Sequence, residues 1–101
     1  MAEVIVSRSA DADLSRLVDF LILEEPVAAL RTYDLLLGAL EVLRTYPSIG
    51  RPVDGILREL VISRGGTGYL ALYEYDALAD RVVILALRHQ REAGYLERGA
   101  S

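Results

Sequence analysis

The chain gathers its chemically versatile side chains in one short stretch near the C-terminus, the octapeptide RHQREAGY. It contains Arg88, His89, Arg91 and Tyr95, and His89 is the only histidine among the 101 residues. A histidine can transfer protons near neutral pH, a guanidinium can bind a phosphate, and a tyrosine ring can stack on a base. The same planar side chains also suit a protein-contact surface. The types and spacing therefore leave three interpretations open: an active site, a docking surface and a hydrated terminal segment.

A strand is expected to lead directly into this stretch. The preceding residues, RVVILALR, contain an unbroken apolar run from Val82 to Leu87 that is rich in β-branched side chains. Strict alternation would put Arg88 on the face of Val82 and Ile84, and His89 on the opposite face with Leu87. Both would then emerge at the rim of the sheet, near the glycine-rich stretch SRGGTG.

Two more strands are expected before it, ILRELVI and YLALYEYD, joined by SRGGTG. The glycines of this connection allow the positive φ values of a hairpin turn, and the stretch lacks the GK[ST] ending of a phosphate-binding loop. Tyr69, Tyr73 and Tyr75 alternate along the second strand and share one face. Since Glu74 and Asp76 accompany them, we expect these rings to pack beneath helices rather than to stack on nucleic-acid bases.

The first half of the chain has the periodicity of a strand followed by two helices. EVIVS, from Glu3 to Ser7, alternates as a short strand, and Ser9 is the expected N-cap of the first helix. The second helix should run from about Pro26 to Tyr46. Each helix carries an apolar stripe, formed by Leu14, Leu17, Val18, Leu21 and Ile22 in the first and by Leu30, Tyr33, Leu36, Leu37, Leu40 and Leu43 in the second.

Glycine and proline mark the remaining features of the helical half. Gly38 costs about 1 kcal/mol of helix propensity relative to alanine, which a close approach of the first helix would explain. The stretch YPSIGRPVDG should end the second helix in an irregular turn. Helices followed by antiparallel strands predict an α+β fold, with an antiparallel helical hairpin packed on one face of a small antiparallel sheet.

Length and composition predict one domain over residues 1–101 and exclude several classes of site. Cysteine is absent, and one histidine with scattered carboxylates offers no ligand cluster, so we expect neither a metal nor a cofactor. The longest aliphatic run is short and no signal peptide is recognisable, so we expect a cytoplasmic protein without membrane contact. The net charge is −4, and none of the 11 basic residues is lysine, which disfavours generic nucleic-acid binding. Hydrophobic residues make up 52%, an excess that a partner could cover.

Four segments in order, YPSIGRPV, LRELVI, GYLALYEYD and VVILALRHQREAGY, resemble the RelE/ParE superfamily of toxins from bacterial type II toxin–antitoxin modules, often labelled plasmid stabilisation proteins. The resemblance covers nearly the whole chain, from Val4 to Tyr95. It implies the element order β-α-α-β-β-β, in agreement with the expectation from the residues. It also implies a toxin that is held inactive by an antitoxin folded onto its apolar surface.

The resemblance leaves the target open, because RelE-like members cleave mRNA on the ribosome whereas ParE-like members inhibit DNA gyrase. A nuclease of the RelE kind would use His89 as base or acid, Arg64, Arg88 or Arg91 as phosphate clamp and Tyr95 as stacking platform. The acidic charge and the missing lysines favour instead a ParE-like gyrase inhibitor with a ParD-like antitoxin and no catalytic residue. A degenerate toxin that only binds its antitoxin is a third possibility. Target or antitoxin contacts are then expected from Arg64, Arg88, His89, Arg91, Tyr95, Leu21 and Leu37.

Overall fold

The structure, a computed structural model, describes residues 1–64 and 67–96 and has the predicted element order with one additional strand. The glycine pair expected at the hairpin turn, Gly65 and Gly66, lies outside the described residues. The elements are β1 (Glu3–Val6), α1 (Arg8–Ile22), α2 (Pro26–Thr45), β2 (Arg51–Asp54), β3 (Leu57–Arg64), β4 (Thr67–Asp76) and β5 (Arg81–His89).

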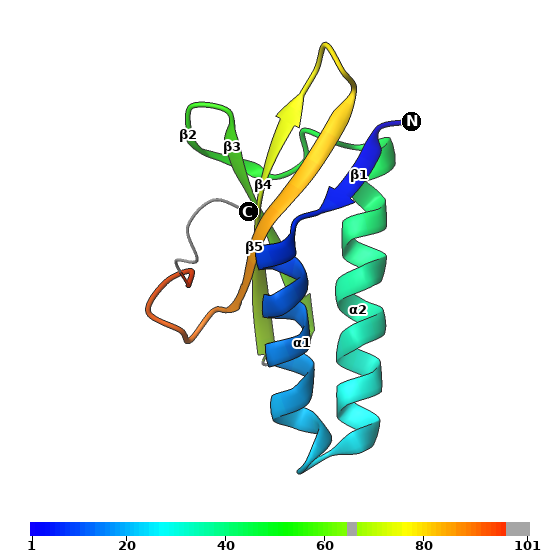
Figure 1. Ribbon diagram of the computed structural model, residues 1–101, viewed down its shortest axis with the longest axis vertical. Helices are drawn as coiled ribbons and strands as arrows, with labels where there is room; N and C mark the ends of the chain where they lie inside the picture. Colours follow the sequence, from blue (N-terminus) through cyan, green and yellow to red (C-terminus); the bar gives the residue numbers. More distant parts are fainter. Residues whose placement is uncertain (65–66, 97–101) are drawn as a thin grey trace.

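The fold has two layers, a five-stranded sheet and the helical hairpin of α1 and α2 that covers one of its faces (Figure 1). The strand order is β1-β5-β4-β3-β2. Strands β2 to β5 are antiparallel, but β1 pairs with β5 in parallel, with Val4 opposite Val82. The predicted α+β hairpin-on-sheet architecture is therefore confirmed, while the expectation of a purely antiparallel sheet is corrected to a mostly antiparallel one.

The extra strand β2 lies within the stretch that was expected to be an irregular turn. It forms one edge of the sheet, and Pro52 within it lies opposite Arg58 of β3. A proline has no N–H to donate and is tolerated in an edge strand, where one side of the backbone has no neighbour. The turn signals of this stretch end α2 as predicted and leave residues 46–50 irregular, whereas the prediction of an irregular segment is wrong for Arg51–Asp54.

The helices begin close to the predicted positions. Ser7 caps α1, because its side chain accepts a hydrogen bond from the backbone N–H of Ala10 at 3.1 Å. The predicted cap, Ser9, is two residues too late and lies buried inside the first turn. Pro26 begins α2, as predicted from its position after the acidic pair.

The core lies between the helical hairpin and the sheet. Its fully buried members include Leu36 and Leu43 of α2 and Tyr73 of β4. Tyr69 is also buried, and Tyr75 packs against the cluster, so the predicted packing of these tyrosines beneath the helices is confirmed.

A β-bulge in β5 changes which residues face the helices. Leu72 lies opposite Ala86, but the next residue of β4, Tyr73, lies opposite Ile84, so one residue of β5 has no partner in β4. Leu87 consequently joins the core with Ile84, and Arg88 points to the outer face. The prediction that Arg88 shares the face of Ile84 is wrong, because it assumed strict alternation through the bulge.

The reason proposed for Gly38 is also wrong. A Cβ placed on this residue would have no neighbour within 4 Å, so no close approach of α1 requires a glycine there. The hairpin is long relative to the sheet: α1 has 15 residues and α2 has 20. Figure 1 shows that both helices continue past the lower end of the strands.

Candidate functional site

The candidate residues of the C-terminal stretch are divided between the two faces of the sheet. His89 lies opposite Tyr69 on the helix-facing side, with the two rings edge-on at 5.1 Å between centroids. Arg88 lies opposite Leu70 on the outer side. Adjacent residues of one strand point to opposite faces, so the strand itself separates the imidazole from the guanidinium.

On the helix-facing side, His89 borders an open groove of about 840 Å³ between α1 and the residues that follow β5. The floor and the α1 wall are mostly apolar, and basic and acidic groups lie on both margins. The lining residues are Arg16, Leu17, Asp19, Phe20, Leu21, Tyr69, His89, Arg91 and Glu92. Such a mixture of apolar surface with a few polar groups is typical of a binding surface.

The imidazole of His89 is already engaged by its own turn. Its Nδ1 accepts a hydrogen bond from the backbone N–H of Arg91 at 3.1 Å, so the neutral ring carries its proton on Nε2. The lone pair that could remove a proton from a substrate therefore points at the protein backbone. In this arrangement His89 is a poor general base.

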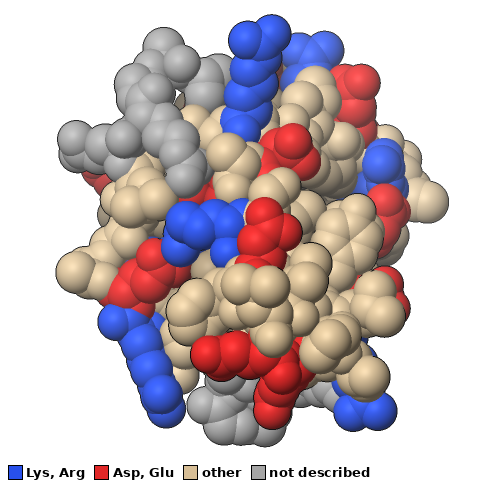
Figure 2. Space-filling model, turned by 60° about the horizontal axis from the view of Figure 1, so that its bottom comes forward, with Lys and Arg blue, Asp and Glu red and all other residues tan. Residues whose placement is uncertain are grey.

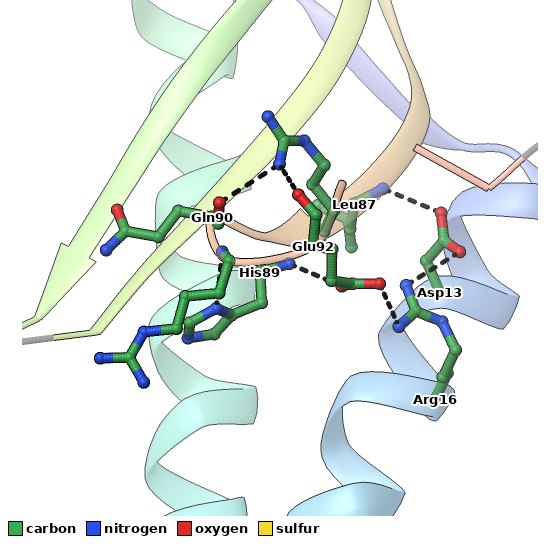
Figure 3. Close-up of polar contacts among 8 residues, drawn as sticks. Asp13, Arg16, Leu87, His89, Gln90 and Glu92 are labelled. Atoms are coloured by element: carbon green, nitrogen blue, oxygen red, sulfur yellow. Dashed lines mark hydrogen bonds and ion pairs between the residues drawn. The ribbon is translucent and has the colours of Figure 1, made fainter. Parts of the chain in front are cut away.

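A chain of polar contacts connects α1 to the turn after β5 (Figure 3). The fully buried Asp13 accepts the backbone N–H of Leu87 at 3.0 Å and lies 3.5 Å from Arg16. Arg16 bonds Glu92 at 2.9 Å, and the other oxygen of Glu92 accepts the backbone N–H of His89 at 2.9 Å. The groove wall on α1 and the turn on the opposite side are thus held at a fixed separation.

The outer face carries a second cluster, built by residues 90–96 returning across the sheet. The guanidinium of Arg88 donates to the carbonyl of Glu92 at 2.8 Å and lies 5.1 Å from the ring centre of Tyr95. The hydroxyl of Tyr95 donates to Glu59 of β3 at 2.7 Å, and Arg51 of β2 also bonds Glu59. Tyr95 therefore joins β5 to β3 across the intervening strand.

The ionisation of this cluster fits a structural role. Burial opposes the charge of Glu59, but the hydrogen bond from Tyr95 and the bonds and charge of Arg51 outweigh it, so the pKa of Glu59 lies below its ordinary 4.5. Burial, together with the Glu59 carboxylate, raises the pKa of Tyr95 far above its ordinary 10.0. Tyr95 is thus a protonated donor at neutral pH, and neither its hydroxyl nor its ring is free to act on a substrate.

The remaining predicted contact residues are spread over the molecule. Leu21 lines the groove, whereas Leu37 lies on α2, half-buried against the core. Arg64 ends β3, and its side chain lies outside the part of the chain that the structure describes. Among the described residues, no group of histidine, cysteine and carboxylate side chains could hold a metal ion. None of the described helices is long and apolar enough to cross a membrane.

Sequence reasoning missed three residues that shape the groove and the two polar clusters. Glu59 is bonded by Arg51 of β2 and by Tyr95 of the segment after β5, and nothing in the local sequence around Glu59 indicates these contacts. Glu92 is bonded across 76 residues to Arg16. Phe20 could have been noticed, because it is the only phenylalanine and lies off the apolar stripe of its helix.

Comparisons with known proteins agree with this architecture. The family described as "ParE toxin of type II toxin-antitoxin system, parDE" matches residues 4–94. The chain belongs to the ParE toxin family. It is therefore a toxin of a type II toxin–antitoxin module, within the RelE/ParE superfamily that the sequence resembles.

Two relatives of this ParE-family chain come from Caulobacter vibrioides. Toxin RelE3 is 36% identical over 92 residues, covering 91% of this chain and 98% of the relative. Toxin RelE1 is 40% identical over 89 residues, covering 88% and 94%. A solved structure, "Chromosomal ParDE TA system from P. aeruginosa", has a TM-score of 0.71 at 22% identity and covers 88% of this chain and 96% of its own. At that identity the likeness shows the fold.

Proposed function

We propose that this ParE-family toxin inhibits DNA gyrase in the bacterial cytoplasm without catalysing a reaction, and that a ParD-like antitoxin neutralises it by folding onto its apolar surface. The proposal rests mainly on the division of the candidate catalytic residues between the two faces of the sheet. A nuclease needs its proton-transfer group and its phosphate clamp around one phosphodiester. Here His89 faces the helices, while Arg88 and Tyr95 face away from them.

The contacts of these residues support the same conclusion. The Nδ1 of His89 accepts a backbone N–H, Arg88 is bonded to a backbone carbonyl, and Tyr95 donates to Glu59. Each is used to hold the C-terminal turn. The net charge of −4 gives no electrostatic help toward an RNA-walled site.

The antitoxin is proposed to contact the groove and the helices, where Leu21 and Leu37 lie. Antitoxins that are disordered alone and fold on binding cover extended apolar surfaces. The solved structure with the same fold is named as a ParDE toxin–antitoxin system, and this name supports an antitoxin as the partner. The polar residues Arg64, Arg88, His89, Arg91 and Tyr95 remain proposed contacts for either the antitoxin or the target.

A second candidate function is ribosome-dependent mRNA cleavage. It is favoured by the names of the two Caulobacter relatives, Toxin RelE3 and Toxin RelE1, and by the presence of His89, Arg88, Arg64 and Tyr95 as a possible nuclease set. It would require the C-terminal turn to rearrange, because the known contacts place the imidazole and the guanidinium on opposite faces.

Induction of the toxin in cells separates the two functions. Gyrase inhibition predicts growth arrest with chromosome breaks, an SOS response and intact transcripts, all relieved by co-expressed antitoxin. Arrest with cleaved transcripts and intact chromosomes, abolished by His89→Ala or Arg88→Ala but not by the exposed control Leu78→Ala, would overturn the proposal in favour of the nuclease. Absence of growth arrest, with antitoxin still bound, would identify a degenerate toxin.

A further inference from the structure

The end of the helical hairpin is an overhang with unusual surface chemistry. It comprises the last residues of α1, the connection and the first turns of α2, here called the hairpin end, residues 19–34. The strands stop before it, so the two helices extend past the sheet here (Figure 1). Several large apolar side chains of the hairpin end are therefore exposed to solvent.

Four large apolar side chains of the hairpin end are mostly exposed: Phe20 at 73%, Leu23 at 91%, Val27 at 61% and Leu30 at 68%. Leu30 belongs to the predicted apolar stripe of α2, but Ala29 and Thr32 are the buried residues of this part of the helix, so Leu30 is left facing solvent. Phe20 also lines the groove, which joins the two surfaces. An exposed apolar area of this kind, continuous with a groove, is typical of an interaction site.

The charge around this apolar area is mostly negative. Residues 19–34 contain four acids, Asp19, Glu24, Glu25 and Asp34, against one base, Arg31, so the segment carries a net charge of −3 (4 acids minus 1 arginine). In Figure 2, which brings this end of the molecule forward, acidic side chains lie directly below a tan surface. In the groove, the positive charge of Arg16 is offset by Asp13 and Glu92, and Arg91 on the opposite margin is the other positive charge. The surface therefore favours a positively charged partner.

We infer that the hairpin end is a docking surface for a cationic amphipathic helix of the antitoxin, with apolar side chains on Phe20, Leu23, Val27 and Leu30 and with lysine or arginine beside the four acids. This inference rests on the proposed neutralisation by an antitoxin and adds the chemistry of the bound segment. In helix-in-groove recognition the bound helix contributes apolar side chains at positions i, i+3, i+4 and i+7. A helix bound at the hairpin end would in this way bury the apolar side chains that the sheet does not reach. Since exposed charge pairs act mainly on specificity and association rate, the acids select the cationic partner and the apolar anchors hold it.

Binding of designed peptides to the full-length toxin tests the inference without knowledge of the antitoxin sequence. Three helical peptides of about 16 residues are compared by titration calorimetry and by amide chemical shifts. One has a leucine stripe with lysines, one has the same stripe with glutamates, and one keeps the lysines but replaces leucine by serine. The lysine–leucine peptide should bind with shifts confined to residues 19–34 and the groove. It should bind at least about tenfold more tightly than the other two, and salt should reduce that margin.

Matched variants of the toxin locate the site. Phe20→Ser with Leu23→Ser should weaken the lysine–leucine peptide by about tenfold or more, whereas Leu78→Ser, at the opposite end and fully exposed, should not change its affinity. Glu24→Gln with Glu25→Gln should reduce the preference for lysine over glutamate, and the exposed control Asp54→Asn should not.

Equal affinity for the lysine and glutamate peptides, a shift footprint elsewhere, or binding of the hairpin end to phospholipid vesicles in place of the peptide would overturn the inference. Failure of the inference is distinguishable from failure of the proposed function, because growth arrest and its relief by the intact antitoxin are measured separately. If the antitoxin relieves growth arrest but the toxin does not prefer the lysine peptide over the glutamate peptide, the proposed function stands and only the cationic docking surface is refuted.

Discussion

Replacement of Tyr73 by phenylalanine removes the hydroxyl that fixes the segment between α2 and β2. Tyr73 is fully buried, and its hydroxyl accepts the backbone N–H of Gly50 at 2.8 Å and donates to the carbonyl of Pro47 at 2.8 Å. Phenylalanine fills the same space as the ring. It leaves both backbone groups without this partner, so the variant isolates the hydrogen bonds from the packing.

The expected size of the effect follows from the burial of the two groups. The N–H of Gly50 is buried, and a buried donor without a partner costs about 1–3 kcal/mol, whereas the carbonyl of Pro47 is less buried and can be hydrated. We expect the free energy of unfolding to fall by about 2 kcal/mol. For a domain of this size the melting temperature should then fall by about 10 °C.

Chemical denaturation of the variant and of Tyr75→Phe measures this directly. The hydroxyl of Tyr75 donates to Asp80 at 3.0 Å in an exposed turn, so its loss should cost less than about 0.5 kcal/mol. Amide exchange at Gly50 should accelerate only in Tyr73→Phe. Equal losses of stability in the two variants, or unchanged exchange at Gly50, would refute the reasoning.

Three further outcomes are expected. Gly38→Ala should raise the free energy of unfolding by about 0.5–1 kcal/mol in urea titrations, because nothing lies within 4 Å of the added Cβ; a loss of stability would show a constraint on this position. Since the pKa of Glu59 is lowered by folding, its contribution to stability is complete above pH 4.5 and is lost as the pH falls through the lower folded value, so Glu59→Gln should lose less stability on acidification than the parent. Tyr95→Phe should raise the pKa of Glu59 in a carboxyl NMR titration, because burial remains while the hydrogen bond that favours the charge is gone; an unchanged pKa would mean that Tyr95 does not bond the carboxylate.

The sequence was sufficient for the element order because the periods of the elements are clear. The apolar stripes of the two helices and the alternating tyrosines of β4 carry enough local information to place each element within a few residues. β2 was not predicted, because the residue types of this four-residue edge strand, which contains Pro52, are also typical of a turn. The parallel pairing of β1 was missed because register between distant segments has no local signature.

The arrangement of the site was harder to predict than the identity of its residues. Arg88, His89 and Tyr95 were recognised from their types, but a single bulged residue in β5 determines which faces Arg88 and His89 occupy, and the turn after β5 places Tyr95. Glu59 and Glu92 acquire their roles from contacts with Tyr95 and Arg16, far away in the chain. Long-range contacts of this kind depend on the completed fold, so residue spacing alone does not reveal them.

Purified toxin offers the most direct measurement of the central claim that it acts on gyrase and not on mRNA. The toxin is added in parallel to gyrase supercoiling relaxed plasmid and to ribosomes translating a defined transcript, each with and without the antitoxin. The account predicts that supercoiling stops, that the antitoxin restores it and that the transcript stays intact. Cleavage of the transcript in the ribosome, with supercoiling unaffected, would contradict it.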